Sequence, residues 1–189
     1  VYKMAAAIGI LNEGVVKPET VLYDPGKITI LQKFTPNDPG VPRDYVCYTY
    51  KTTGAGHGDV NFLRGVALSC DVYFYKVGGG FADEVPNGGL GPNRLAEYAK
   101  ALGYGAKSGI ELPGEAVGVV PDPKWKRLTQ QENWATGDTY ITTIGQGFVT
   151  ATPLQVLISF ATLANDGVMM KPTLIKEILD SEGNIVKPF

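Results

Sequence analysis

The side chains best able to do chemistry are crowded into the stretch from Gly56 to Tyr75. It holds His57, the only histidine of the chain, and then Cys70, one of two cysteines. Ser69 and Asp71 flank this cysteine. An imidazole, a thiol, a hydroxyl and a carboxylate can serve as metal ligands, as acid–base groups or as nucleophiles. We therefore expect the functional site to include this stretch.

Two common kinds of site are not indicated by the sequence. A Ser-His-Asp hydrolase would need His57 as its base, and the chain has no Gly-x-Ser-x-Gly motif. A phosphate-binding loop is not indicated either, because Gly145-Gln146-Gly147 lacks the required lysine. A serine enzyme with a lysine base and a metal site both remain, and they can coexist. Lys3 is the one charge among the first ten residues, and by residue type alone it could simply extend to solvent.

The other candidate ligands are equally open when judged by residue type. Cys47 and Cys70 could be two buried thiols, a disulfide or metal ligands. Asp24 stands in Tyr-Asp-Pro-Gly, where aspartate most simply stabilises a turn.

Composition limits the class of protein. The 189 residues suffice for one well-buried core, and the chain is 44% hydrophobic and 19% charged. A net charge of −2 without a basic run argues against a nucleic-acid partner. No apolar run approaches the roughly 18 residues of a membrane span. The 24 glycines and 13 prolines predict long ordered loops between modest helices.

Hydrophobic spacing and helix-end signals predict a largely helical arrangement. A loop with small strand pieces, such as 27–31, is expected over 15–58. A second long loop is expected over 105–138, and Trp125 and Trp134 should dock it onto the body of the domain. Thr152, Pro153 and Gln155 form a helix-start pattern for an apolar helix that we expect to be central and buried. The predicted elements are a helix over 1–11, one or two helices over 61–76, a helix over 95–102, a helix over 153–163 and a β-hairpin over 174–189.

Several motifs in order resemble the transpeptidase domain of class B penicillin-binding proteins, most closely the elongation-type monofunctional enzymes. The resemblance runs through essentially the whole chain. Its motifs are Val-Tyr-Lys-Met-Ala-Ala-Ala at the start, Ser69-Cys70-Asp71 followed by Val-Tyr-Phe-Tyr, Arg94-Leu95-Ala96-Glu97-Tyr98, Ser108-Gly109-Ile110-Glu111-Leu112-Pro113-Gly114-Glu115, Gly137-Asp138-Thr139, the run from Ile144 to Gln155, and Leu163-Ala164-Asn165-Asp166-Gly167.

The resemblance implies an α+β, β-lactamase/transpeptidase-like (penicilloyl-serine transferase) fold, with this chain supplying mainly the helical portion and a C-terminal hairpin of the sheet. Residues 1–189 would then be the central part of one domain. The nucleophilic serine of Ser-x-x-Lys is expected just before Val1, and the Lys-Thr-Gly-like third motif after Phe189. The chain by itself is therefore expected neither to transpeptidate nor to form a penicilloyl adduct.

Residue roles follow from the same resemblance. Lys3 matches the lysine base, and Ser69 the second-motif serine that relays a proton to the leaving amine. Asp71 stands where the family usually has asparagine and should position the substrate amide. The implied substrate-binding residues are Asp71, Gly145, Gln146 and Gly147.

Elongation-type members are similar in carrying a zinc site beside the second motif. The matching positions here are Asp24, Cys47, His57 and Cys70, with Asp44 as a substitute for Cys47. Two thiolates, one imidazole and one carboxylate suit tetrahedral zinc, and four protein ligands make a closed, structural site.

The implied function is peptidoglycan cross-linking by a D,D-transpeptidase through an acyl-enzyme, with stem peptides as substrates and β-lactams as inhibitors. The implied location is the extracytoplasmic face of a bacterial membrane, with an anchor outside this chain, and the implied partners are a glycan polymerase and other elongation-complex proteins. A non-catalytic, zinc-stabilised domain that senses peptidoglycan or β-lactams is the alternative from another class. A D,D-carboxypeptidase is a third possibility.

Overall fold

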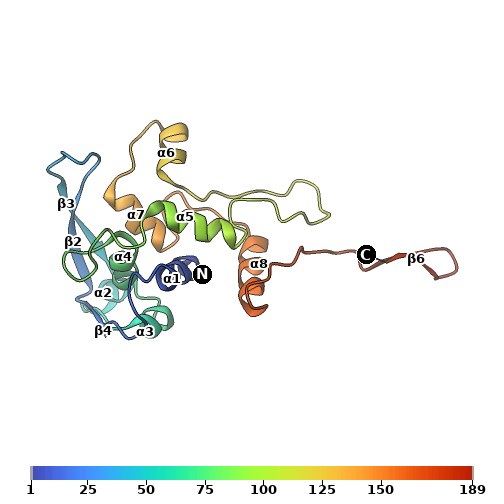
Figure 1. Ribbon diagram of the computed structural model, residues 1–189, viewed down its shortest axis with the longest axis horizontal. Helices are drawn as coiled ribbons and strands as arrows, with labels where there is room; N and C mark the ends of the chain where they lie inside the picture. The colour runs from blue at the N-terminus through green and yellow to red at the C-terminus, as the bar shows by residue number, and fades with distance from the viewer. Residues whose placement is uncertain (1, 189) are drawn as a thin grey trace.

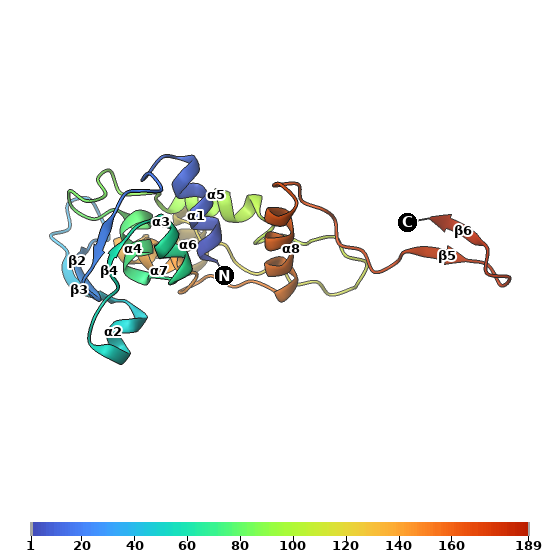
Figure 2. The ribbon, with the colours of Figure 1, turned by 90° about the horizontal axis from the view of Figure 1, so that it is seen from below.

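The computed structural model describes residues 2–188. A body of helices and short strands lies at one end of the molecule, α8 borders it, and the C-terminal segment extends away as an arm (Figures 1 and 2). The elements in chain order are α1 (Lys3–Asn12), β1 (Leu22–Asp24), β2 (Lys27–Gln32), β3 (Val41–Val46), α2 (Tyr48–Thr53), β4 (Gly58–Val60), α3 (Phe62–Ala67), α4 (Asp71–Gly79), α5 (Pro92–Ala101), α6 (Pro123–Gln130), α7 (Thr136–Thr143), α8 (Pro153–Ala164), β5 (Glu177–Leu179) and β6 (Ile185–Pro188).

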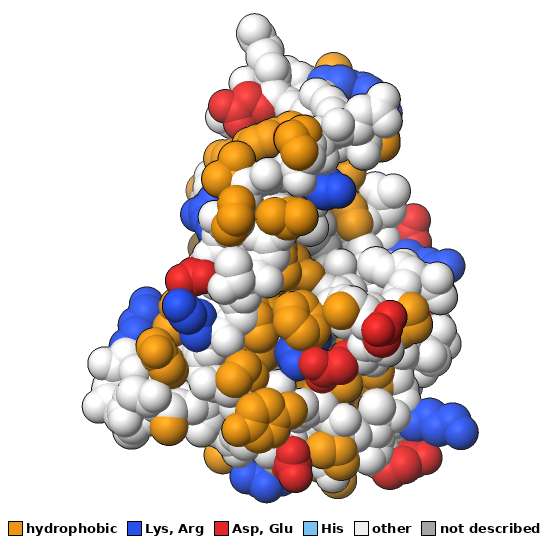
Figure 3. Space-filling view, turned by 90° about the vertical axis from the view of Figure 1, so that its left-hand side faces the viewer, with side chains coloured by type: hydrophobic (Ala, Val, Ile, Leu, Met, Phe, Trp, Pro, Cys, Tyr) orange, Lys and Arg blue, Asp and Glu red, His pale blue; other side chains and the backbone are white. Residues whose placement is uncertain are grey.

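The strands of the described chain form three separate two-stranded antiparallel sheets: β1 with β4, β2 with β3, and β5 with β6. In the first sheet Asp24 is paired with Gly58, which brings the residue after His57 beside the Asp-Pro-Gly turn. The longer β2–β3 hairpin forms the end of the body that faces the viewer in Figure 3. Exposed hydrophobic side chains are prominent on that face, and charged side chains are scattered among them.

The core is built around α4, in which every side chain from Val72 to Val77 is buried. The helix α1 packs against α4 and α5 through the small side chains of Ala5, Ala6 and Ala7. Close packing of α4 on α7 requires a glycine, because a Cβ atom on Gly78 would lie 2.2 Å from the Thr143 hydroxyl oxygen. Small residues therefore allow α1, α4, α5 and α7 to pack closely behind the candidate site.

Of the two alternatives predicted for 61–76, one helix or two abutting helices, the structure has two, α3 and α4. Asn61 caps α3 by accepting a hydrogen bond from the Arg64 backbone, and α4 begins at Asp71. Between the two helices Ser69 has φ +49°, a left-handed conformation that is uncommon for a residue other than glycine. The helix break thus places a strained serine at the point where the sequence predicted chemistry.

Both long loops contain more regular structure than we predicted. The stretch 15–58 includes the whole β2–β3 hairpin and the helix α2, and 105–138 includes α6. Asp122 accepts a hydrogen bond from the Trp125 backbone and Pro123 follows it, which is a normal helix start on a short polar segment. The prediction that tryptophans dock the second loop agrees with the structure, since the Trp125 ring lies 5.3 Å from that of Phe148 and Trp134 donates to Thr139.

The start of α8 is as predicted, with a capping box between Thr152 and Gln155. The expectation that α8 is central and buried is wrong: Leu157 is 64% and Phe160 41% exposed. The side that faces the body is mixed: Ile158 is buried there, the Gln155 amide donates to two loop carbonyls, and Ser159 meets Tyr104. Loop carbonyls that need donors thus help to decide which face of this helix is covered.

The predicted C-terminal hairpin is confirmed as β5 and β6. Its turn is held by Asp180, whose carboxylate accepts hydrogen bonds from the backbones of Glu182 and Asn184. Within residues 2–188, none of the helices has both the length and the apolar character needed to cross a membrane.

Candidate functional site

Lys3, Ser69 and Asp71 meet in one polar cluster, as the resemblance implied. The Lys3 ammonium donates to the Ser69 hydroxyl at 2.9 Å and to the Ser69 carbonyl at 2.6 Å. It also forms an ion pair with the Asp71 carboxylate at 2.6 Å. Ser69 itself is exposed to solvent. A lysine, a hydroxyl and a carboxylate are thus held within hydrogen-bond reach of one another beside open solvent.

Three elements position these groups. Lys3 begins α1, Ser69 lies in the break after α3, and Asp71 opens α4, where the helix N-terminus favours a negative charge. The second oxygen of Asp71 accepts a hydrogen bond from the backbone of Tyr48 at 3.2 Å. Both carboxylate oxygens therefore already have protein partners, and the substrate-positioning role of Asp71 stays a prediction.

The Gly145-Gln146-Gly147 turn follows α7 and lies beside the residue that precedes Lys3. Gly145 has φ +76°, and a Cβ atom on it would lie 2.5 Å from the Cβ of Tyr2. A cavity of about 250 Å³ is lined by Tyr2, Gly145 and their neighbours. This position is compatible with the predicted substrate contact, which no observation on the three residues tests.

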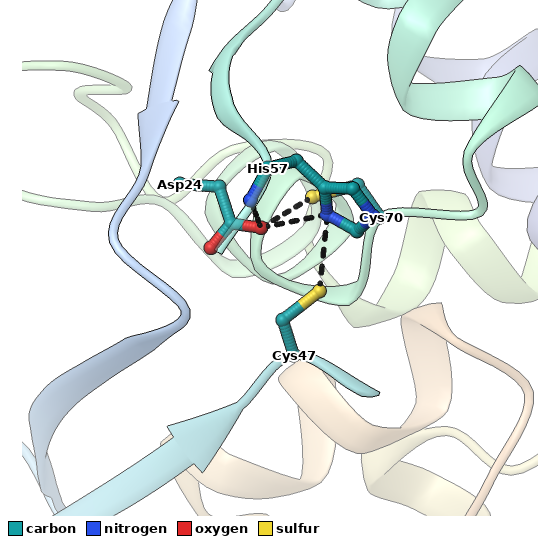
Figure 4. A group of neighbouring side chains, drawn as sticks. All are labelled: Asp24, Cys47, His57 and Cys70. Atoms are coloured by element: carbon teal, nitrogen blue, oxygen red, sulfur yellow. Dashed lines mark hydrogen bonds and ion pairs between the residues drawn. The ribbon is translucent and has the colours of Figure 1, made fainter. Parts of the chain in front are cut away.

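The four predicted metal ligands also converge (Figure 4). Their ligand atoms all lie within 4.8 Å of one another, with His57 Nδ1 at 2.9 Å from an Asp24 oxygen and 3.4 Å from Cys47 Sγ. Cys70 Sγ lies 3.1 Å from the same Asp24 oxygen. The two cysteines are free thiols, so the disulfide alternative does not describe this structure.

Local structure explains how four distant ligands reach one point. Cys47 ends the β2–β3 hairpin as the N-cap of α2, and Cys70 is the N-cap of α4. Gly56 lets the third segment approach, because a Cβ atom there would lie only 2.1 Å from the Gly26 backbone nitrogen and 2.2 Å from the Asp24 carbonyl oxygen. His57 then donates its backbone N–H to the Asp24 carboxylate at 3.0 Å.

The chemistry of this donor set fits a zinc ion. In a tetrahedral site with zinc–ligand bonds of about 2.0 to 2.3 Å, ligand atoms lie about 3.3 to 3.8 Å apart, and the distances found here, from 2.9 Å to no more than 4.8 Å, span that range. The side chain of Asp24 is only 1% exposed and that of His57 is 8% exposed, which suits a closed site. Asp44 lies elsewhere, where it pairs with Lys27 and Thr29 on the exposed hairpin, so Cys47 and not Asp44 completes the cluster.

The contact between the two thiols shifts their pKa values in opposite directions. A hydrogen bond from Cys70 lowers the pKa of the Cys47 thiol to about 5. The same contact, together with burial, raises the pKa of Cys70. Burial acts to raise the pKa of Asp24, but hydrogen bonds chiefly from His57 and Cys70 outweigh it and hold that pKa below its usual value. Without a metal, the cluster thus concentrates negative charge that a cation would neutralise.

Sequence reasoning missed one residue of this region, Tyr48. Besides its backbone contact with Asp71, its hydroxyl donates to the Leu68 carbonyl at 3.1 Å and its ring packs edge-on against His57. Its position directly after Cys47 is the only signal in the sequence, and that signal does not specify a contact with residues 68–71.

Comparison with known proteins defines the class. The penicillin binding protein transpeptidase domain family matches residues 1–188, and the chain belongs to that family. It is 34% identical over 174 residues to the peptidoglycan D,D-transpeptidase MrdA of Acinetobacter baumannii, covering 92% of this chain and 23% of the relative. The Escherichia coli K12 protein of the same name is 34% identical over 173 residues, covering 92% of this chain and 24% of that relative.

Solved structures agree with this placement. Pseudomonas aeruginosa PBP2, in a complex with WCK 5153, superposes with a TM-score of 0.77 at 33% identity, covering 98% of this chain and 38% of the other. A Helicobacter pylori complex between PBP2 and MreC superposes with a TM-score of 0.72 at 31% identity, covering 90% of this chain and 28% of the other. The predicted fold and the likeness to elongation-type class B enzymes are confirmed. The chain spans about a quarter of the length of the two relatives named above.

Proposed function

We propose that this chain is the central part of the transpeptidase domain of a longer enzyme that cross-links peptidoglycan. The observation that carries the proposal is the contact of Lys3 Nζ with Ser69 Oγ at 2.9 Å, between two motifs that are 66 residues apart. The nucleophilic serine would stand immediately before Val1 and the third motif after Phe189. The names of the relatives favour this enzyme over the non-catalytic sensor alternative.

In the proposed reaction, the serine hydroxyl attacks the carbonyl of the penultimate D-alanine and gives its proton to the Lys3 amine, which has to release the ammonium proton of its ion pair with Asp71 before it acts as the base. The tetrahedral intermediate expels D-alanine, whose amine receives a proton through Ser69, and an ester to the serine remains. An amine of a neighbouring strand then attacks that ester, loses its proton along the same path and releases the serine. Ser69 suits a relay because a hydroxyl both accepts and donates a hydrogen bond.

The proposal extends to location and partners. The longer enzyme would act on stem peptides at the extracytoplasmic face of the bacterial membrane, held by an anchor outside this chain, and β-lactams would acylate the same serine. A glycan polymerase and other elongation-complex proteins are the proposed partners. Support comes from similar proteins that were solved with MreC or within a peptidoglycan synthase complex.

For the buried cluster we infer a structural zinc ion held by Asp24, Cys47, His57 and Cys70. Bound there, zinc would neutralise the cluster and cross-link four chain segments. Four protein ligands leave no open position for substrate, so the ion would act on the active site only through the positions of Ser69 and Asp71.

The test uses the longer protein and a fluorescent penicillin. We expect a stable adduct, located by mass spectrometry on the serine immediately before Val1, and no adduct on the 189-residue chain alone. A protein that binds the penicillin reversibly, without a mass increase, would favour the sensor alternative. Products from a stem-peptide substrate with and without an acceptor amine would separate transpeptidase from D,D-carboxypeptidase activity.

A further inference from the structure

Tyr48 touches both polar clusters without belonging to either. It follows Cys47, its ring lies 5.4 Å from the His57 ring, its backbone N–H donates to Asp71, and its hydroxyl donates to the Leu68 carbonyl. These contacts bridge the two ends of the segment 68–71, which contains the strained Ser69. One residue of α2 therefore spans the turn that presents the serine.

We propose that Tyr48 is a positioning residue for the transpeptidase reaction, which holds Ser69 in its left-handed conformation through the Leu68 carbonyl and Asp71. This inference rests on the function proposed above. Leu68 is the C-cap of α3, so its carbonyl stands at the point where the chain leaves helical geometry. A hydrogen bond to that carbonyl holds the peptide plane directly before Ser69 from one edge, while the Ser69 N–H bond to Val66 holds the other edge, and together they maintain the backbone position from which the hydroxyl extends.

The other contacts of this turn do not replace the hydrogen bond from the Tyr48 hydroxyl to the Leu68 carbonyl. The Lys3 ammonium holds the Ser69 carbonyl, the Ser69 backbone N–H donates to the Val66 carbonyl at 3.1 Å, and the Cys70 backbone N–H returns to Gly65. The contacts with Val66 and Gly65 tie the turn back to α3, whereas the Leu68 carbonyl, on the other edge of the peptide plane before Ser69, is held by Tyr48. Lys3 acts on the far side of Ser69, and its charge and donor protons change whenever its amine takes a proton from the nucleophile. The tyrosine contact is independent of that proton transfer, so it can hold Ser69 throughout the reaction.

Tyr48→Phe in the longer protein removes the hydroxyl and keeps both the ring and the backbone N–H. Tyr50→Phe is the matched control, because Tyr50 is on the same helix and, within residues 2–188, its hydroxyl makes no hydrogen bond to a side chain or carbonyl. Tyr48 is 48% exposed, so water partly replaces the lost bond. We expect the second-order rate constant of acylation by fluorescent penicillin to fall roughly 3- to 10-fold in Tyr48→Phe and to stay unchanged in Tyr50→Phe.

Zinc content and melting temperature distinguish positioning from a general structural role. For Tyr48→Phe we expect the zinc-to-protein ratio of the wild type and a melting temperature within a few degrees of it. An acylation rate equal to that of the wild type would overturn the proposal. A slower rate accompanied by loss of zinc would also overturn it, because the effect would then pass through the metal cluster.

If the wild-type protein forms no adduct, the proposed function fails, but the role of Tyr48 in this turn is not yet contradicted. Hydrogen exchange then tests that role separately. The backbone amides of residues 68–71 should exchange faster in Tyr48→Phe than in the wild type and Tyr50→Phe. Equal exchange rates in the three proteins would show that the hydroxyl does not hold this turn.

Discussion

The two polar clusters share the segment 69–71 but differ in their access to solvent. Cys70 points into the group of Asp24, Cys47 and His57, where Asp24 is almost completely buried. Its two neighbours point the other way, toward Lys3, and Ser69 is exposed. Alternation along three residues thus builds a closed site on one side and an open one on the other. This difference supports the proposal that the first cluster has a structural role and that the second takes part in the chemistry.

We call Asp24, Cys47, His57 and Cys70 the closed cluster, and Lys3, Ser69 and Asp71 the open cluster. The largest effect is expected from His57→Ala in the closed cluster. Removal of the only imidazole should lower the zinc-to-protein ratio from about one to near zero and reduce the melting temperature by many degrees, because zinc binding and folding are coupled. Plasma mass spectrometry and calorimetry measure the two quantities.

Asp44→Ala is the control for this variant, since Asp44 lies on the exposed hairpin and pairs only with surface groups. It should retain zinc and the wild-type melting temperature to within a few degrees. Zinc retained by His57→Ala, or absent from the wild type, would contradict the assignment of the closed cluster.

In the open cluster, Lys3 gives the largest expected effect on activity. Lys3→Met should lower the acylation rate about 100- to 10,000-fold, because the serine loses its base. Lys3→Arg should be nearly as slow, since arginine keeps a positive charge toward Asp71 but cannot accept a proton. Both variants should retain zinc, and Lys17→Met on the exposed loop should react like the wild type.

A fast Lys3→Arg variant would show that Lys3 supplies charge and not base catalysis. Loss of zinc from Lys3→Met would contradict the separation of the two clusters.

Gly56→Ala tests whether the closed cluster depends on backbone contact. The added Cβ would overlap the backbone of Gly26 and Asp24, so the loop has to move and carry His57 with it. We expect a 10- to 100-fold loss of zinc affinity, measured by competition with a chelator. Gly54→Ala, on the same loop with open space around it, bears only the strain of its φ of +73° and should keep its zinc affinity. Equal affinities would show that the loop adapts freely.

The sequence predicted those parts that depend on short-range signals. The capping box at Thr152 and the C-terminal hairpin follow from neighbouring residues, whereas the helical character of 61–76 was predicted without the position of its break between α3 and α4. The two clusters were predicted only through the family resemblance, because their members come from segments far apart in the chain.

The remaining features depend on tertiary contacts that residue type does not reveal. Lys76 and Lys126 are charged yet almost fully buried, each satisfied by a carboxylate from outside its own helix. The covered side of α8 and the contacts of Tyr48 are of the same kind, since a distant carbonyl helps to decide each of them. Such pairings appear only once the chain is folded, because no local pattern specifies the partner.

The smallest effect is expected at α6, a helix that contributes no residue to either cluster. Asp122 accepts a hydrogen bond from the Trp125 backbone, and Asp122→Ala should cost about 1 kcal/mol of unfolding free energy at neutral pH. Burial acts to raise the pKa of Asp122, but the contacts with Trp125 and Lys100 outweigh it and lower that pKa. A lowered pKa means that the stabilisation is complete above the unfolded value of about 3.9 and is lost as the pH falls through the folded value.

The difference in stability between wild type and Asp122→Ala should therefore shrink below about pH 4. Asp122→Asn keeps the acceptor without the titrating group, so its stability should stay close to that of the wild type at neutral pH. It should exceed that of the alanine variant at every pH. Neither variant should change zinc content or acylation, because α6 supplies no ligand and no reacting group. A changed acylation rate would mean that α6 is coupled to the open cluster through Phe148 and the turn that precedes α8.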